Sequence, residues 1–288
     1  MNKLYLECNT GLSGDMAVAS LIGLGADEDA LLKVLKTVPD HSFEIKISHV
    51  KKSAIDCMDF DVVLDKEHEN HDHDMEYLYG DHHDHEHEHH HHEHHHHHDH
   101  EHGHEHGHDH EHHHDHFHRP YSEVKEILSK IGMTDGARAL SEKIFAILAE
   151  AEAAVHGMNI EDVTFHEVGA IDSIVDIVSF AVCFDNLEID EVIIPKICEG
   201  QGHVMTRHGK LPVPVPAVLK IAELHKLPIS ITERQGEFIT PTGAAIAAAT
   251  MTGRKLPETM SIVRTGYGAG KREYDPPGIV RAVLFEEA

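Results

Sequence analysis

The chain has 288 residues, 40% of them hydrophobic, which is enough for the core of one large domain or two modest ones. Its formal net charge of -27 argues against a nucleic-acid partner, because a phosphate backbone attracts basic surfaces. No apolar run has the length of a membrane span, and the N-terminus lacks the pattern of a signal peptide. The four cysteines form neither a disulfide framework nor a C-x-x-C pair, so we expect a reducing, cytoplasmic setting without membrane partners.

The first 65 residues are predicted to form an α/β part. Apolar residues spaced three or four apart indicate helices, and alternation of apolar with polar residues indicates strands. These patterns predict strands at 3–8, 43–50 and 58–64, and helices at 16–24 and 29–35. Turn-forming residues connect the first strand to the first helix.

Residues 66–118 interrupt this pattern with a tract of His, Asp and Glu. The tract holds 27 of the 34 histidines, and residues 65–118 carry 17 acidic residues against one lysine. Because core-forming residues are almost absent, burial cannot offset the entropy lost on ordering. We therefore expect the metal-free tract to be disordered.

The tract predicts binding of divalent transition metals. Neutral imidazole is a nitrogen ligand that suits nickel, copper and zinc, and acidic neighbours attract cations and complete coordination shells. Many interchangeable sites favour buffering or delivery over fixed catalysis. A solvated linker without function is the alternative. The expected metal ligands in the tract include His85, His87, His89, His94, His96, His104, His106 and His108.

Residues 119–288 return to a globular pattern and are expected to complete the same domain. The predicted helices cover 121–131, 137–156, 173–187, 216–224 and 241–251. The predicted strands cover 191–198, 229–232 and 279–285, with a loop or short strand at 164–169 and an extended segment at 211–216. Helices and strands alternate, so we expect an α/β or mixed α+β fold.

Two segments combine carboxylates with helix starts. At residues 7–16 a strand, a glycine-bearing loop and a helix follow one another, so backbone N–H groups near Gly14 could hold an anion and Asp15 could face a metal. A tight turn with Asp15 as a cap is the alternative. At 166–176, Asp172 and Asp176 lie four apart, on one face of the predicted helix. Such like charges are costly unless they are paired or bind a metal, although Asp172 could simply cap the helix.

Two further segments are candidates for binding an anionic ligand. Residues 199–210 combine glycines and histidines with Arg207 and Lys210, either as an anion clamp or as a flexible surface loop. Residues 240–245 place hydroxyl groups and free N–H groups at a helix start, where capping by Thr240 or Thr242 explains the pattern equally well. Downstream, cationic residues lie close to glycines in the chain and could also face an anion. They are Arg264, Lys271 and Arg272.

Together these segments resemble the LarC family of nickel insertion proteins. The matching segments are 8–16, 166–176 and 240–244, with the histidine-rich insertion between the first two, and the resemblance covers nearly the whole chain. It implies a nickel chelatase of the lyase class. Such proteins insert nickel into pyridinium-3,5-bisthiocarboxylic acid mononucleotide and so form the nickel-pincer nucleotide used by lactate racemase.

The resemblance also implies cofactors and partners. The family reaction consumes CTP and needs magnesium or manganese as a second divalent ion. Members commonly carry a further C-terminal region, with which CTP binding is associated. We therefore expect this chain to act with such a portion, to be inactive without it, and to serve lactate racemase as a recipient.

The implied chemistry assigns roles to particular residues. Forming a nickel–carbon bond on a pyridinium ring requires loss of a ring proton, so a base is needed close to the metal. His166 and Glu167 are the candidates, with Asp15 or Asp172 holding nickel or the second ion. A phosphate-bearing substrate would be bound by the groups predicted to face anions. These are Gly14, Arg207, Lys210 and Thr242.

Two other functions compete with this hypothesis. A non-enzymatic nickel store or chaperone would depend on the tract itself. A metal-dependent hydrolase would use His166 and nearby acids, although no H-E-x-x-H helix supports it.

Overall fold

The computed structural model describes residues 2–64, 75–79, 119–165 and 169–287, and the fold is mixed α/β as predicted. Of the tract, the structure describes only Met75–Tyr79, which forms a short helix. The rest of the tract, with its expected metal ligands, lies outside the described residues, so its boundaries and its state remain predictions. Within the described part, no helix is both long enough and apolar enough to cross a membrane.

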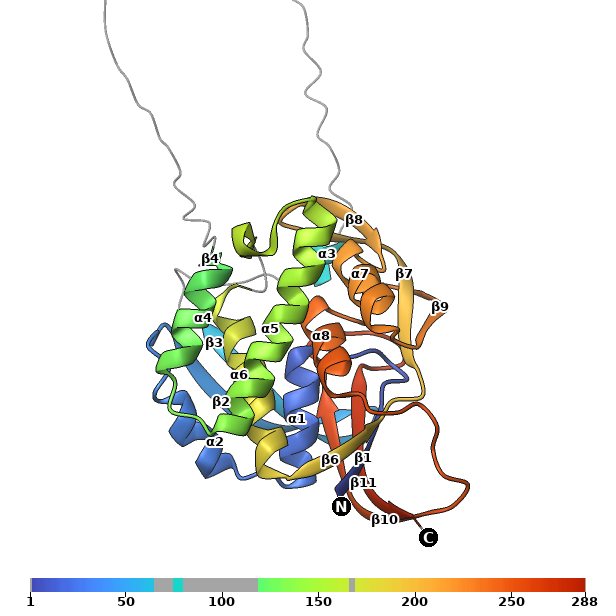
Figure 1. The fold of residues 1–288 in the computed structure, drawn as a ribbon. Helices are drawn as coiled ribbons and strands as arrows, with labels where there is room; N and C mark the ends of the chain where they lie inside the picture. The colour runs from blue at the N-terminus through green and yellow to red at the C-terminus, as the bar shows by residue number, and fades with distance from the viewer. Residues whose placement is uncertain (1, 65–74, 80–118, 166–168, 288) are drawn as a thin grey trace, which may run out of the picture.

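A six-stranded mixed sheet unites segments from both sides of the tract (Figure 1). Its order is β2-β3-β10-β11-β1-β6. The parallel pairs are β1 with β6 and β3 with β10, and the remaining neighbours are antiparallel. The strands are β1 (Asn2–Glu7), β2 (Phe43–Lys52), β3 (Ile55–Leu64), β6 (Ile189–Ile193), β10 (Met260–Ala269) and β11 (Ile279–Glu287).

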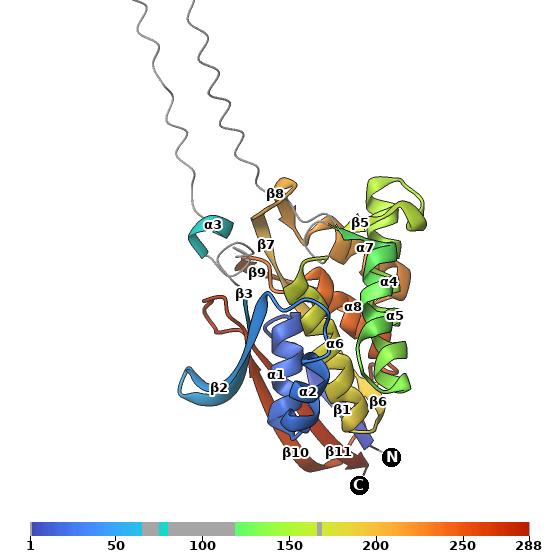
Figure 2. The same cartoon turned by 90° about the vertical axis from the view of Figure 1, so that its left-hand side faces the viewer.

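Helices cover one face of this sheet in successive layers (Figure 2). The first layer contains α1, of whose 11 residues ten are buried, and α6, which is rich in buried apolar residues. The longer α5 packs on α6 from the far side. The helices are α1 (Gly14–Leu24), α2 (Glu28–Leu35), α3 (Met75–Tyr79), α4 (Tyr121–Lys130), α5 (Asp135–His156), α6 (Ile171–Asn186), α7 (Pro216–His225) and α8 (Pro241–Thr250).

Strand β10 was not predicted, and its glycines explain why. Glycine disfavours strands, so the segment around Gly266 and Gly268 shows no clear strand pattern. In the structure these glycines let β10 touch the α1 backbone. A Cβ at Gly266 would lie 2.2 Å from the Ser20 carbonyl oxygen, and one at Gly268 would lie 2.1 Å from that of Met16. The glycines therefore serve helix–sheet packing at these two contacts.

A three-stranded sheet of order β8-β7-β9 lies beside α7 and α8. It consists of β7 (Ile197–Thr206), β8 (Gly209–Val213) and β9 (Ile229–Gln235). The prediction of a loop at 199–210 was wrong, because nearly all of this segment forms the β7–β8 hairpin. Strand β7 also pairs with β9. The local glycine-rich sequence does not reveal this strand, because its backbone hydrogen bonds are made with a strand that lies further along the chain. A short sheet of β4 (Arg119–Pro120) and β5 (Thr164–Phe165) and the 3-10 helix Ile160–Asp162 complete the described elements.

Candidate functional site

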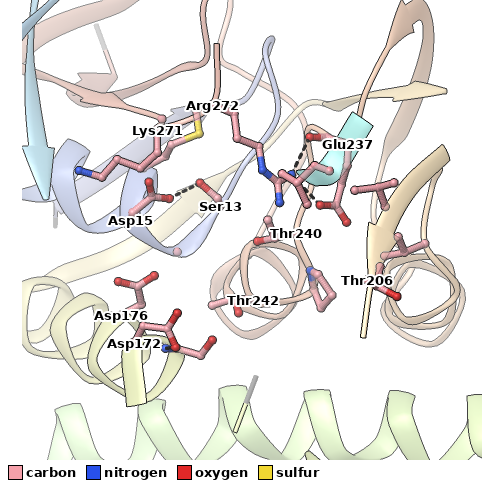
Figure 3. A pocket seen from close by; sticks show the side chains of 18 of the residues that line it. Ser13, Asp15, Asp172, Asp176, Thr206, Glu237, Thr240, Thr242, Lys271 and Arg272 are labelled. Atoms are coloured by element: carbon pink, nitrogen blue, oxygen red, sulfur yellow. Dashed lines mark hydrogen bonds and ion pairs between the residues drawn. The ribbon is translucent and has the colours of Figure 1, made fainter. Parts of the chain in front are cut away.

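A cavity of about 430 Å³ lies where α1, α6 and α8 begin. The cavity is also lined by the end of α5, the β7–β8 hairpin, the start of α7, residues 60–64, Leu78, residues 237–238 and residues 270–278. Figure 3 shows Asp15, Asp172 and Asp176 on one side of it and Glu237 with Arg272 on the other. Charges of both signs therefore face one space that is large enough for a small organic ligand.

Backbone pairing brings the starts of α1 and α8 together. The Leu12 N–H donates to the Phe238 carbonyl at 2.9 Å, and the Thr240 N–H donates to the Leu12 carbonyl at 3.1 Å. A Cβ at Gly243 would lie 2.0 Å from the Leu12 carbonyl oxygen, so this approach requires glycine. The Thr240 side chain caps α8 by accepting from the Gly243 N–H at 3.2 Å. Both helices therefore direct their N-termini at the same cavity.

Three aspartates meet where α1 and α6 begin. Asp15 is only 7% exposed and accepts a hydrogen bond from the Ser13 hydroxyl. A Cβ at Gly14 would lie 2.6 Å from Asp176 Oδ2, so the start of α1 can touch this carboxylate only because residue 14 is glycine. Burial raises the pKa of Asp176 well above its ordinary value, and the charges of Asp15 and Asp172 raise it further. The cluster therefore favours a proton or a cation.

Asp172 lies in the first turn of α6 and is not its cap. The N-cap is Ala170, whose side chain has no oxygen to offer, so the prediction of Asp172 as the cap was wrong. The Asp172 carboxylate accepts from the adjacent Ser173 N–H at 2.8 Å and lines the cavity. A carboxylate in the first turn still interacts favourably with the helix dipole.

Lys271 balances part of the negative charge. Its ammonium group lies 2.7 Å from Asp59 and 3.3 Å from Asp61, both on β3. It also lowers the pKa of Asp176, against the larger effects of burial and like charge. Lys271 is thus a cation beside carboxylates of two separate elements, β3 and α6.

A buried ion pair forms the opposite wall. Arg272 lies 2.6 Å from Glu237, and their side chains are 14% and 7% exposed. The Tyr274 hydroxyl donates to the Glu237 carbonyl at 2.9 Å, and the Tyr79 hydroxyl of α3 accepts from the Glu237 N–H at 2.9 Å. The two tyrosine hydroxyls also bond to each other at 2.6 Å. This network attaches α3 to the wall of the cavity.

Glu199 holds the loop that carries this wall. Its Oε1 accepts from the N–H groups of Gly200, Phe238 and Ile239 at 2.8, 2.6 and 3.2 Å. Its Oε2 is buried and has no hydrogen-bond partner in the described part of the chain. Burial raises the pKa of Glu199 from 4.5 to about 7. The carboxyl group therefore favours its neutral form in the fold.

Replacing Glu199 by Gln is expected to remove a pH-dependent loss of stability. The folded state holds this proton more tightly than the unfolded chain, so the parent loses stability as the pH rises from 4.5 to about 7. Gln keeps an oxygen for the three N–H groups and carries no charge. The two proteins should unfold alike in urea at pH 4, whereas at pH 8 the variant should be more stable by about 3 kcal/mol, the free energy of the shift in pKa from 4.5 to about 7. An equal difference in stability at both pH values would contradict this prediction. Glu286→Gln, at an exposed position, is the control.

The structure assembles only some of the predicted site residues. Gly14, Asp15, Asp172 and Thr242 all line the cavity. Arg207 and Lys210 are exposed residues of the β7–β8 hairpin and do not line it. His166 and Glu167 lie outside the described residues, as do the predicted ligands of the tract. Among the described residues, no three His, Cys, Asp or Glu side chains are arranged as a metal site.

Sequence reasoning gave no role to Glu199 or Glu237. A carboxylate directly next to a glycine is the sequence feature that both share. Lys271 and Arg272 were considered for an anionic ligand and do line the cavity. Arg264 does not, because it caps the other end of α1 by donating to the Leu24 carbonyl at 2.9 Å.

Comparison with known proteins agrees with the resemblance seen in the sequence. A family model described as "Nickel insertion protein" matches residues 4–288. A protein of Alkaliphilus metalliredigens named pyridinium-3,5-bisthiocarboxylic acid mononucleotide nickel insertion protein is 45% identical over 99% of this chain and 61% of its own length. One with the same name from Clostridium acetobutylicum is 41% identical over 100% of the chain and 64% of its own length.

A putative nickel insertion protein of Geobacter sp. is 34% identical over 100% of the chain and 62% of its own length. The chain thus spans less than two thirds of the length of these relatives. No solved structure matches it.

Proposed function

This chain belongs to the nickel insertion protein family, and from that premise we propose that it inserts nickel into pyridinium-3,5-bisthiocarboxylic acid mononucleotide. The product is the nickel-pincer nucleotide, with lactate racemase as its recipient. The observation that carries the proposal is the cavity. A cluster of aspartates, basic side chains and the N-termini of helices all face this one space. A metal cation and a phosphorylated, ring-bearing substrate need such complementary surroundings at short range.

The aspartates are the groups that would receive the metal cargo. Asp15, Asp172 and Asp176 repel one another, and a divalent cation would offset the burial and like charge that raise the pKa of Asp176. Their oxygens also suit magnesium or manganese, the second ion that the family resemblance implies. Because no three of the described side chains are prearranged as a metal site, the substrate's two thiocarboxylate sulfurs would complete the coordination of nickel.

The insertion step needs a proton acceptor. The nickel–carbon bond forms as the ring C–H bond breaks, so one proton leaves for a base. With Asp15 and Asp172 holding the cation, the ionised Asp176 carboxylate is suited to this role, because burial raises its pKa and so makes it a stronger proton acceptor than an ordinary carboxylate. His166 and Glu167 remain candidates from the sequence, just before Gly169 at the start of the α6 segment.

The opposite wall would position the phosphate. Arg272 lines the cavity on this wall, and Thr242 lines it at the N-terminus of α8, whereas Lys271 lies on the side of the aspartates. A helix start and a nearby cation together favour an anion. CTP is assigned to a C-terminal portion beyond this chain, and the partnership with that portion is part of the proposal. A cytoplasmic setting agrees with the four buried cysteines, all of which are free thiols.

Nickel storage is the second candidate function, and the tract favours it. Deleting residues 81–117 would separate the two functions while retaining α3, whose Tyr79 bonds to the cavity wall. If insertion is the function, we expect the shortened chain to form as much nickelated nucleotide as the full chain at saturating nickel. It should, however, need a higher nickel concentration than the full chain for half-maximal formation. Mass spectrometry of the nucleotide across a nickel titration measures both quantities. Loss of product at every nickel concentration would favour storage and delivery by the tract.

A further inference from the structure

A second group of metal-binding side chains lines the same cavity. Glu152 and His156 lie one turn apart on α5, and His156 Nε2 is 3.3 Å from the Glu152 carboxylate. The ring of His208, at the turn of the β7–β8 hairpin, has its centroid 5.1 Å from that of His156. All three residues line the cavity that also contains Asp172 and Asp176.

We propose that Glu152, His156 and His208 form a loading site that takes up one nickel ion in this cavity and passes it to the aspartates. That the ion is nickel rests on the function proposed above. Two imidazole nitrogens and one carboxylate oxygen are ligands that nickel accepts. Because one cavity joins this group to the aspartates, an ion released here can move to them within that cavity.

The local structure favours a cation at this place. His156 is the last residue of α5, where unpaired carbonyl groups give the helix its negative end. Glu152 has a side chain only 19% exposed. A cation bound beside it would offset the cost of keeping a partly buried carboxylate charged.

Hairpin geometry places the third side chain. The Thr206 hydroxyl accepts from the His208 N–H at 3.1 Å and donates to the Gly209 carbonyl at 2.9 Å, which shapes the turn. His208 itself is exposed. Closing a coordination sphere with Glu152 and His156 needs a rotation of its ring, which an exposed side chain makes on a ps–ns timescale.

Chemical modification of histidine tests this site in the full chain, because peptide mass mapping reports each histidine separately from those of the tract. Diethyl pyrocarbonate would be applied at free nickel concentrations set by a chelator buffer. We expect nickel to protect His156 and His208 together, with one midpoint, while His49 stays reactive. His49 is the matched control, since it is an exposed imidazole 2.8 Å from Asp56 that does not line the cavity. Equal reactivity of His156 and His208 at every nickel concentration would overturn the proposal.

Substitutions show whether the three side chains act as one site. Glu152→Gln should raise the nickel concentration for half protection at least about tenfold, and His156→Ala should abolish protection of His208. His49→Ala should change neither value. Undiminished protection of His208 in His156→Ala would also overturn the proposal. Nucleotide product without nickel protection would refute the loading site alone, whereas protection without product would refute the insertion function alone.

Discussion

Replacing Asp176 by Asn is expected to lower formation of nickelated nucleotide at least about 100-fold, the effect of losing a positioned proton acceptor. The same change should stabilise the fold by about 1 kcal/mol, because groups gathered for function commonly cost stability. Asp176 is partly buried beside two other carboxylates, Asp15 and Asp172, and Asn keeps its shape without its charge. Product yield by mass spectrometry and urea unfolding measure the two effects.

The gain in stability should depend on pH in a defined direction. The pKa of Asp176 is raised in the folded state, so the parent is favoured while this group is neutral and loses stability as the pH rises through the raised pKa. The advantage of the Asn variant should therefore grow from acid to neutral pH. Asp29→Asn, at an exposed position in the first turn of α2, is the matched control; it should leave the yield unchanged and cost less than about 1 kcal/mol of stability at every pH above about 5. A variant with full activity would remove Asp176 from the mechanism.

Replacing Arg272 by Met is expected to destabilise the protein by about 3–5 kcal/mol, the cost of leaving one partner of a buried ion pair alone. The carboxylate of Glu237 is 7% exposed and lies 2.6 Å from the guanidinium group. Arg272 also donates to the Glu237 carbonyl at 3.2 Å, so its loss weakens the loop that forms this wall. Denaturant unfolding measures the change in the free energy of unfolding.

A double replacement separates the contribution of the ion pair to stability from that of side-chain packing. Arg272→Met combined with Glu237→Met should recover much of the lost stability, because apolar side chains of similar volume can replace a buried pair at little cost. Lys125→Met is the matched control. It breaks an exposed pair with Glu161, 3.3 Å away, and should cost less than about 1 kcal/mol. A cost for Arg272→Met no larger than that of the control would contradict the account of this wall.

Much of the fold follows from local patterns in the sequence. Alternation and helical periodicity predicted β1, β2, α1 and α5 close to their observed bounds. The β7–β8 hairpin and β10 were missed because their glycines weaken the local pattern that indicates a strand. The reason for glycine at these positions appears only in the structure, where they contact backbone from distant parts of the chain. Gly266 against Ser20 is such a contact, joining residues that are far apart in the chain.

The candidate site shows the same limit. Gly14, Asp15, Asp172 and Thr242 were expected to be functional, and all four line the cavity. The sequence does not reveal that Asp15 and Asp176 are neighbours, because the packing of α1 on α6 brings them together. Nor does it place Arg272 against Glu237 or His208 against His156, since each pair joins different elements. Local patterns thus identify suitable residue types, whereas tertiary packing decides which of them meet.

The most direct measurement is the mass of the nucleotide after incubation with the protein. The full chain would be incubated with pyridinium-3,5-bisthiocarboxylic acid mononucleotide, nickel, magnesium and CTP, with and without the C-terminal portion of a relative. If the chain inserts nickel, the product will be heavier than the precursor by one nickel ion, less the protons displaced. Unchanged precursor in every combination, from a chain that is folded and binds nickel, would contradict insertion as its function.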